Sequence, residues 1–395
     1  MLMNLASRPI YLDYHATTPT DPRVAAVVHR YMTEVFGNAS SVDHSFGDEA
    51  LAAVERARKY VANLIEADAK NIVFTSGATE SLNLALQGLV RAFRSQGQRR
   101  PLRVGLLPVE HLAVIETCQA LAESGEVEPT YFTVDQRGRL DLGDVEAKCR
   151  NGLDLVCVMA ANNEIGTLYP IEDAARIAHE YGSLFLTDAT QAAGKIPIRF
   201  EDWGIDLLAL SAHKMYGPKG VGALVVAPGV RLEALLFGGG HQGGRRSGTL
   251  NVPGIAGLGE ASRLRQNEMA DDEPRIATQR DRLERLLIEG IPEVTVNGDP
   301  ERRLAGNLHV SVNGLPNGPV IARLRNRVAL STGAACSSGI EAPSHVLRAL
   351  ALPRDAIDGA LRIGLGKFTT DNDVERAARE IVSVVSQVRV ALSAA

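Results

Sequence analysis

Between about residues 70 and 230, the sequence alternates short apolar runs with longer amphipathic runs. The apolar runs predict strands, and the amphipathic runs have the spacing of helices. Strands that are apolar throughout and separated by helices indicate a mostly parallel sheet, covered by helices on both faces. The predicted strands are "NIVF", "RVGLLPV", "LVCVMA", "SLFLTDA", "LLALSA" and "VGALVV". Ligands of such sheets bind at the carboxyl ends of the strands.

A second, smaller α+β unit is predicted beyond about residue 263. It opens with a long charged amphipathic stretch, which predicts a helix that crosses between the two units and is broken near Pro274. The strands "NLHVSV", "RVALSTG" and "LRIGLG" follow, and the helix "DVERAAREIVSVVSQVRVAL" closes the unit. We therefore expect a large domain over residues 15–262 and a small domain formed by residues 1–14 and 263–395.

The composition is that of a soluble enzyme. Of the 395 residues, 45% are hydrophobic and 23% are charged, with a net charge of −5. A nucleic-acid-binding face would need clustered basic residues, so we expect no direct contact with nucleic acid. No apolar run approaches the roughly 18 residues that span a bilayer, and the first residues do not resemble a leader peptide, so we expect a cytoplasmic protein without membrane contact.

The four cysteines are far apart in the sequence. Cys118, Cys149, Cys157 and Cys336 form no C-x-x-C pair, which disfavours a disulfide framework and a cysteine-only zinc site; we expect no metal. The first three lie in apolar or helical segments, where a cysteine usually serves as a small hydrophobic residue.

A lysine lies where one of the predicted strands ends, in "LLALSAHKMYGPKG". Lys214 could be a solvated loop residue, but a desolvated lysine in a cleft can form an imine with an aldehyde cofactor. Asp188 ends another predicted strand, where a carboxylate could keep a pyridine nitrogen protonated, as pyridoxal phosphate requires. Ser211 and His213 beside the lysine suit a phosphate. Together these residues predict a pyridoxal phosphate site.

Two glycine-containing loops are candidates for binding phosphate. In "IVFTSGATESLNLAL", Gly77, Ala78 and Thr79 lie between a predicted strand and a helix start, where free N–H groups attract an anion or are simply capped. The other loop, "FGGGHQGG", matches G-x-G-x-x-G, but no strand precedes it and no apolar helix follows. We therefore do not interpret it as a dinucleotide site.

The sequence resembles the pyridoxal-phosphate-dependent cysteine desulfurases of the class V aminotransferase group, almost from end to end. The resemblance implies fold type I of the pyridoxal-phosphate-dependent transferases, with a mostly parallel large domain and a smaller α+β domain. It implies a homodimer that converts L-cysteine to L-alanine. The matching segments are "YLDYHATTP", "FGNASS", "VFTSGATESLNLAL", "VEHLAV", "ANNEIGTL", "TDATQAAGK", "SAHKMYGPKG", "GGGHQGGRRSGTLNV", "STGAACSSGIEAPSHVLRAL" and "LRIGLGKFTT".

The resemblance also implies roles for the residues around the cofactor ring. Lys214 is similar to the Schiff-base lysine, and Asp188 to the partner of the pyridinium nitrogen. Gln191 is similar to the glutamine that bonds the phenolic oxygen. His111 matches the histidine that stacks on the ring and moves protons, and Asn163 matches the asparagine beside the cofactor and substrate.

Further matches concern the phosphate. Ala78, Thr79, Ser211 and His213 resemble the phosphate cradle of the family. Thr249 resembles a residue that reaches this cradle from the partner subunit of the homodimer. A monomer would therefore leave the phosphate with fewer ligands.

Cys336 determines which reaction the resemblance implies. It lies in "STGAACSSGIEAPS", whose small residues suit a mobile loop, as in the first group of desulfurases. Arg362 resembles the arginine that binds the substrate carboxylate. The implied reaction frees the amine of Lys214 to remove the Cα proton of cysteine. The Cys336 thiolate then attacks the substrate sulfur, becomes a persulfide, and passes this sulfur to an acceptor protein.

Other functions and acceptors stay open at this point. A selenocysteine lyase or a class V aminotransferase is the main alternative, and a non-catalytic protein with the same fold is a third. Lys367 stands where many relatives have arginine. Relatives that serve iron–sulfur assembly carry a docking tail, whereas this sequence ends at "VRVALSAA". We therefore expect weak binding to an iron–sulfur scaffold, with tRNA thiolation or DNA phosphorothioation as other possible destinations.

Overall fold

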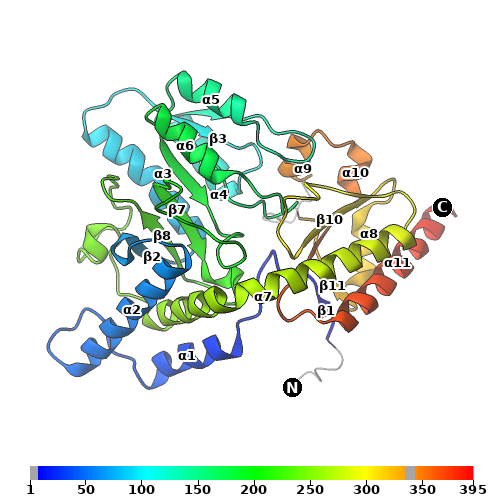
Figure 1. Ribbon diagram of the computed structural model, residues 1–395, viewed down its shortest axis with the longest axis horizontal. Helices are drawn as coiled ribbons and strands as arrows, with labels where there is room; N and C mark the ends of the chain where they lie inside the picture. The colour runs from blue at the N-terminus through cyan, green and yellow to red at the C-terminus, as the bar shows by residue number, and fades with distance from the viewer. Residues whose placement is uncertain (1–7, 334–342, 395) are drawn as a thin grey trace.

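The larger part of the molecule is built on a seven-stranded sheet (Figure 1). The computed structural model describes residues 8–333 and 343–394. The strand order is β2-β8-β7-β6-β5-β3-β4, and only β8 is antiparallel to its neighbours. This confirms the predicted mostly parallel sheet. The strands are β2 (Ile72–Thr75), β3 (Leu102–Leu106), β4 (Val127–Tyr131), β5 (Leu155–Cys157), β6 (Leu184–Asp188), β7 (Leu207–Ser211) and β8 (Gly222–Val226).

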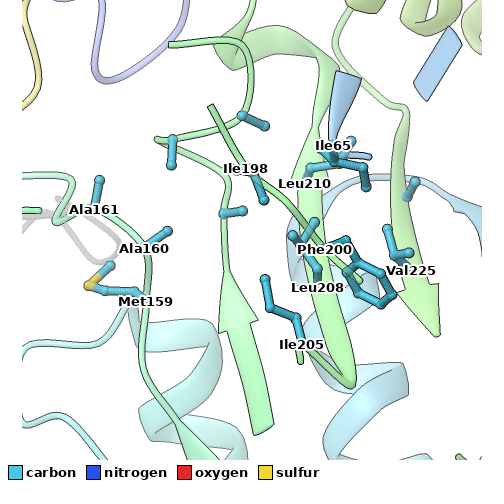
Figure 2. Packing of buried hydrophobic residues seen from close by; sticks show 14 of the residues in the cluster. Ile65, Met159, Ala160, Ala161, Ile198, Phe200, Ile205, Leu208, Leu210 and Val225 are labelled. Carbon is cyan, nitrogen blue, oxygen red and sulfur yellow. The ribbon is translucent and has the colours of Figure 1, made fainter. Parts of the chain in front are cut away.

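Both faces of this sheet are buried, which explains why its strands are apolar throughout. Successive side chains of a strand point to opposite faces. On β7, Leu208 and Leu210 belong to one hydrophobic cluster, whereas Leu207 and Ala209 belong to another. Figure 2 shows part of the first cluster, in which Leu208 and Leu210 lie together with Phe200.

Helices cover the two faces. Three helices, α2 (Ser45–Leu64), α5 (Leu142–Arg150) and α6 (Ile171–Glu180), contribute to the cluster on the first face. On the second face lie α3 (Ala78–Ser95) and α4 (Leu112–Glu123). The helix α1 (Pro22–Thr33) and the short helices η2 (Ala69–Asn71), η3 (Ala212–Lys214) and η4 (Gln242–Gly244) complete this part. No helix in residues 8–333 or 343–394 is long and apolar enough to cross a membrane.

The smaller part has a separate hydrophobic cluster around an antiparallel sheet of order β12-β10-β9. A two-stranded parallel pair joins β1 near the N-terminus to β11. The helix α11 packs beside α7, which runs along both parts of the molecule (Figure 1). These elements are β1 (Ile10–Tyr11), α7 (Val252–Gly290), β9 (Val294–Val296), β10 (Asn307–Val312), α8 (Asn317–Leu324), β11 (Val328–Ala329), α9 (His345–Ala349), α10 (Arg354–Asp358), β12 (Ala360–Gly364) and α11 (Asp371–Ser393).

The predicted break of the crossing helix at Pro274 is wrong. The helix α7 runs without interruption from Val252 to Gly290, with Pro274 inside it. Proline removes one backbone hydrogen bond and usually kinks or breaks a helix. Here the buried Arg265 bonds Asp272 and Glu273 at 2.6 and 2.7 Å, and these ion pairs brace the turns before the proline. Side-chain contacts therefore offset the lost backbone bond.

Candidate active site

The carboxyl ends of three strands meet at one cavity of about 720 Å³. Because β8 is antiparallel to both β2 and β7, these two strands run in the same direction, and β6 is parallel to β7. All but two of the predicted site residues line this cavity: Ala78, Thr79, His111, Asn163, Asp188, Gln191, Ser211, His213, Lys214 and Arg362. Thr249 is exposed and does not line it. Cys336 lies outside the described residues.

One end of the cavity has the features of an anion site. Gly77 has a φ of +151°, which favours glycine, and it precedes α3 without a side-chain cap. The first N–H groups of the helix are therefore available to an anion. The Ser211 hydroxyl lies 3.7 Å from the position that a Cβ atom on Gly77 would take. This close approach brings the end of β7 against the start of α3.

His213 lies on the same side of the cavity. Its Nδ1 is 3.1 Å from the Thr17 hydroxyl, a contact that sequence reasoning missed. Burial, together with the Lys214 charge, lowers the pKa of His213 to about 4. The ring is therefore neutral at physiological pH, and it can donate one hydrogen bond to a phosphate oxygen.

Asp188 ends β6 and is buried. Its Oδ1 atom accepts a hydrogen bond from the Thr190 N–H group at 2.9 Å. Among the described residues, Oδ2 has no hydrogen-bond partner of its own. A buried carboxylate with a free oxygen that lines a cavity suits a protonated ring nitrogen.

Lys214 is the chemically most distinctive group of the cavity. Its amine donates hydrogen bonds to the carbonyl oxygens of His15 and Ala16. Burial lowers its pKa to about 7, and the positive charges of Lys195 and Arg362 act in the same direction. No carboxylate of the described chain lies within 4.0 Å of this amine. A large fraction of Lys214 is therefore an uncharged nucleophile near neutral pH.

Gln191 also bonds the segment around His15, whose carbonyl oxygen accepts a hydrogen bond from the Lys214 amine. The Gln191 amide nitrogen donates to the His15 carbonyl oxygen at 2.9 Å, and Lys195 donates to the Gln191 Oε1 atom at 3.1 Å. His15 lies in the segment between β1 and α1, and the sequence provided no local signal that this segment reaches the sheet. Only its position in the fold identifies it as part of the cavity wall.

Arg362 reaches the cavity from β12 in the smaller part of the molecule. Its Nη1 donates to the Asn163 carbonyl oxygen at 3.1 Å, and its Nη2 pairs with Asp13 at 3.0 Å. The buried Nε atom has no hydrogen-bond partner in the described part of the chain. This guanidinium can bind a carboxylate, in competition with Asp13.

His111 caps the start of α4. Its Nδ1 accepts a hydrogen bond from the Ala113 N–H group at 3.1 Å, so a neutral ring carries its proton on Nε2. The ring is exposed within the cavity wall, and its Nε2–H group can donate a hydrogen bond there.

The three described cysteines are buried and form no disulfide with one another. Burial raises the pKa of Cys118 to about 12 and that of Cys149 to about 11. The thiol of Cys157, on β5, also has a raised pKa because it is buried. None of these three is a nucleophile at neutral pH.

The side chains and helix end of this cavity fit pyridoxal phosphate. A weakly basic lysine can hold its aldehyde carbon, a buried carboxylate its ring nitrogen, and an uncapped helix N-terminus its phosphate. These groups lie far apart in the sequence but line the same cavity. Such an arrangement is not expected of polar residues that cluster by chance.

Comparison with known proteins agrees with this geometry. The aminotransferase class-V family matches residues 10–377. The chain is 46% identical over 383 residues to the cysteine desulfurase IscS of Anaeromyxobacter sp. (strain Fw109-5), covering 96% of this chain and 93% of that protein. It is 42% identical to a cysteine desulfurase of Mus musculus, covering 97% and 82%.

Solved structures give the same result. A NifS-like protein superposes with a TM-score of 0.89 at 34% identity, over 96% of this chain and 99% of the other. DndA from Streptomyces lividans superposes with a TM-score of 0.76 at 35% identity, over 89% and 98%. The chain therefore belongs to the class V aminotransferase family, and within it to the pyridoxal-phosphate-dependent cysteine desulfurases.

Proposed function

We propose that L-cysteine is desulfurised in the cavity at the ends of β2, β6 and β7, with Lys214 as the amine that moves the proton. The observation that carries this assignment is the Lys214 amine itself. The residue is half-buried at the cavity, its amine faces carbonyl oxygens rather than carboxylates, and its pKa is lowered to about 7 by desolvation and by neighbouring positive charges.

The cofactor-binding residues follow from their places around the cavity. Lys214, Asp188 and Gln191 would hold the aldehyde carbon, the ring nitrogen and the phenolic oxygen of pyridoxal phosphate. Ala78, Thr79, Ser211 and His213 would hold its phosphate. When bound, the cofactor supplies an electron sink for the substrate's Cα.

The remaining residues act on the substrate. Arg362, whose Nε has no partner among the residues that the structure describes, would bind the carboxylate of L-cysteine beside Asn163. The neutral Lys214 amine would take the Cα proton and return it later, and His111 would donate a hydrogen bond from its Nε2–H group to the reacting atoms. The Cys336 thiolate would attack the substrate sulfur. The Cβ–S bond then breaks, its electron pair stays on Cβ and is protonated, and L-alanine and a Cys336 persulfide remain.

The proposal includes a homodimer. Thr249 is exposed in a single subunit, in a loop that carries Arg246, and Arg246 pairs with Glu80 of α3 at 2.8 Å. This pairing places the loop beside the anion end of the cavity, which supports a contribution of Thr249 to the cavity of a second subunit. An active, cofactor-loaded monomer in analytical ultracentrifugation would contradict the homodimer.

The test of the proposed function is Cys336→Ala in the cofactor-loaded enzyme. This variant should still change its absorption spectrum on binding L-cysteine, because every residue of the cavity is retained. It should form no protein persulfide and release sulfide at no more than the background rate. Cys157→Ala is the matched control and should keep sulfide release. Normal sulfide release by Cys336→Ala would contradict the assignment.

A further inference from the structure

A second buried lysine lies behind the cavity wall. The Lys195 amine is enclosed by protein, although part of its side chain reaches solvent, and it does not line the cavity. It donates a hydrogen bond to the Gln191 Oε1 atom at 3.1 Å. The proposed mechanism gives this lysine no task.

Lys195 is connected to Lys214 by a short chain of hydrogen bonds. Gln191 receives the bond from Lys195 on its carbonyl side and donates from its amide nitrogen to the His15 carbonyl oxygen at 2.9 Å. The same carbonyl oxygen accepts a hydrogen bond from the Lys214 amine. Because Lys195 can only donate, it determines which end of the Gln191 amide faces it. The His15 carbonyl oxygen, which can only accept, favours the same orientation, and the His15 Nδ1 atom lies 3.3 Å from Gln191 Oε1, so Lys195 is one of three contacts that orient Gln191.

Charged side chains of α7 act on the charge of Lys195. Arg265 is paired with both Asp272 and Glu273, and Arg275 also pairs with Asp272 at 3.1 Å. Burial lowers the pKa of Lys195, and so does Arg265, but the Glu273 carboxylate counteracts both effects. The Glu273 carboxylate, whose own pKa is raised to about 7 by burial, is thus the group that favours the protonated form of Lys195.

Other charged groups near Lys214 also affect its protonation. Arg362 disfavours the charged form of Lys214, whereas Asp13 and Asp188 favour it. His15 adds no charge, because burial and the Lys195 charge hold its pKa well below the usual value. His213 is also neutral, because burial and the Lys214 charge lower its pKa. Among the described residues, Lys195 and Arg362 are therefore the two cations that most strongly oppose the protonation of Lys214.

We propose that Lys195 is a positioning residue for Lys214: it orients Gln191, and its positive charge keeps the Lys214 amine in the uncharged form that can attack an aldehyde. This inference rests on the proposed role of Lys214 but concerns a property of the apoprotein. In the absence of Lys195, the Lys214 amine would be protonated over a wider pH range. It would then react more slowly with pyridoxal phosphate at neutral pH.

The test is the pH dependence of Lys214 acetylation in the apoprotein. A trace of isotopically labelled acetic anhydride is applied from pH 5 to pH 11, and the Lys214 peptide is quantified by mass spectrometry. We expect a midpoint near 7 in the wild type. In Lys195→Met, which loses both charge and donor, the midpoint should rise by about one pH unit, as expected when a like charge is removed at close range.

Two further variants separate the charge from the hydrogen bond and guard against misfolding. Lys195→Gln keeps a neutral donor for Gln191 and should give the same rise. Lys219→Met is the matched control. Lys219 is exposed at the same cavity and is not among the charges that shift Lys214, so the midpoint should stay within about 0.2 units because solvent screens exposed charges.

The outcomes distinguish this inference from the proposed function. An unchanged midpoint in folded Lys195→Gln and Lys195→Met, with the fold checked by circular dichroism, would overturn the role of Lys195. The same result would leave the tests of Cys336 and of sulfide release untouched. A rise in the Lys195 variants but not in Lys219→Met supports it. Slower recovery of cofactor absorbance on reconstitution at pH 7 should accompany that rise.

Discussion

Two lysines of this enzyme are buried in very different surroundings. Lys214 faces the carbonyl oxygens of His15 and Ala16, with two cations acting on it. Lys367 instead bonds two carboxylates, Asp21 at 2.6 Å and Glu268 at 3.0 Å. The first amine loses its proton readily, whereas the second is held in ion pairs.

The surroundings of Lys367 explain its structural task. Asp21 precedes α1 and Glu268 lies on α7, so the lysine ties the N-terminal segment to the helix that spans both parts of the molecule. Its amine also lies 5.2 Å from the ring centre of Tyr216. Bonds from Arg23 and Lys367 hold the pKa of Asp21 well below its usual range. The comparison shows that the partners of a lysine, rather than its burial, determine whether it has a chemical or a structural task.

The largest expected effect comes from replacing each of these two lysines separately. Lys214→Ala should reduce sulfide release by roughly 10²–10⁴-fold or more, as for the loss of a general base. Lys367→Met should retain most activity but lower the free energy of unfolding by about 1–3 kcal/mol, because Asp21 keeps Arg23 but loses one partner. Steady-state assays and urea unfolding measure the two effects.

Lys70→Met serves as the surface control for both variants, because Lys70 pairs only with the exposed Asp68. It should change neither quantity appreciably. If Lys367→Met abolished activity without loss of stability, the division between a chemical and a structural lysine would not hold.

A smaller effect concerns the pH dependence of stability in the apoprotein. The pKa of Lys214 is lowered to about 7 by burial and by nearby cations, so folding opposes its protonation. This penalty is complete below pH 7 and fades as the pH rises toward the usual value of a lysine. Lys214→Met should therefore be more stable than the wild type at pH 6, by on the order of 2 kcal/mol, and the difference should shrink above pH 9.

The Asp21 carboxyl has the opposite dependence. Because its pKa is lowered by Arg23 and Lys367, its contribution to stability is present above its unfolded value, about 3.9, and is lost as the pH falls further. In thermal unfolding scans, Lys367→Met should lose less stability than the wild type between pH 4 and pH 2. A parallel loss in both proteins would show that Lys367 does not stabilise the Asp21 charge.

The smallest expected effect is at an exposed ion pair. Arg354 and Asp358 of α10 lie 2.8 Å apart, but the Arg354 side chain is largely in solvent and the Asp358 side chain is nearly half exposed. Exposed pairs of this kind contribute little because solvent screens them. Arg354→Ala should change the free energy of unfolding by less than about 0.5 kcal/mol, measured by urea unfolding. A larger loss would mean that burial is not what separates weak from strong pairs here.

The sheet and the cavity could be predicted because their signals are local. Asp188 and Lys214 each follow an apolar strand, and the carboxyl ends of parallel strands lie at one edge. The strand β4 was missed because its sequence, "VEPTY", contains a proline and a charge at the sheet edge. The break at Pro274 was wrongly predicted because the bracing pairs of Arg265 cannot be recognised from a local pattern.

The contacts around Lys214 could not be predicted for a different reason. His15 and Thr17 are nearly 200 positions away from the residues that they contact, and no pattern in their own segment indicates it. Beside Lys195, Arg265 of α7 donates to the Gly194 carbonyl oxygen at 2.7 Å, so the enclosure of the Lys195 amine is a tertiary property. Long-range contacts thus determine the basicity of Lys214, whereas the sequence motif predicts only its position at the end of a strand.

The most direct test of the central claim is to identify the lysine that holds the cofactor. The enzyme loaded with pyridoxal phosphate is reduced with borohydride, digested and analysed by mass spectrometry. We predict that the reduced cofactor is attached to Lys214, and that Lys214→Ala carries none. Attachment to Lys195, Lys219 or Lys367 in the wild type, or no attachment at all, would contradict the account.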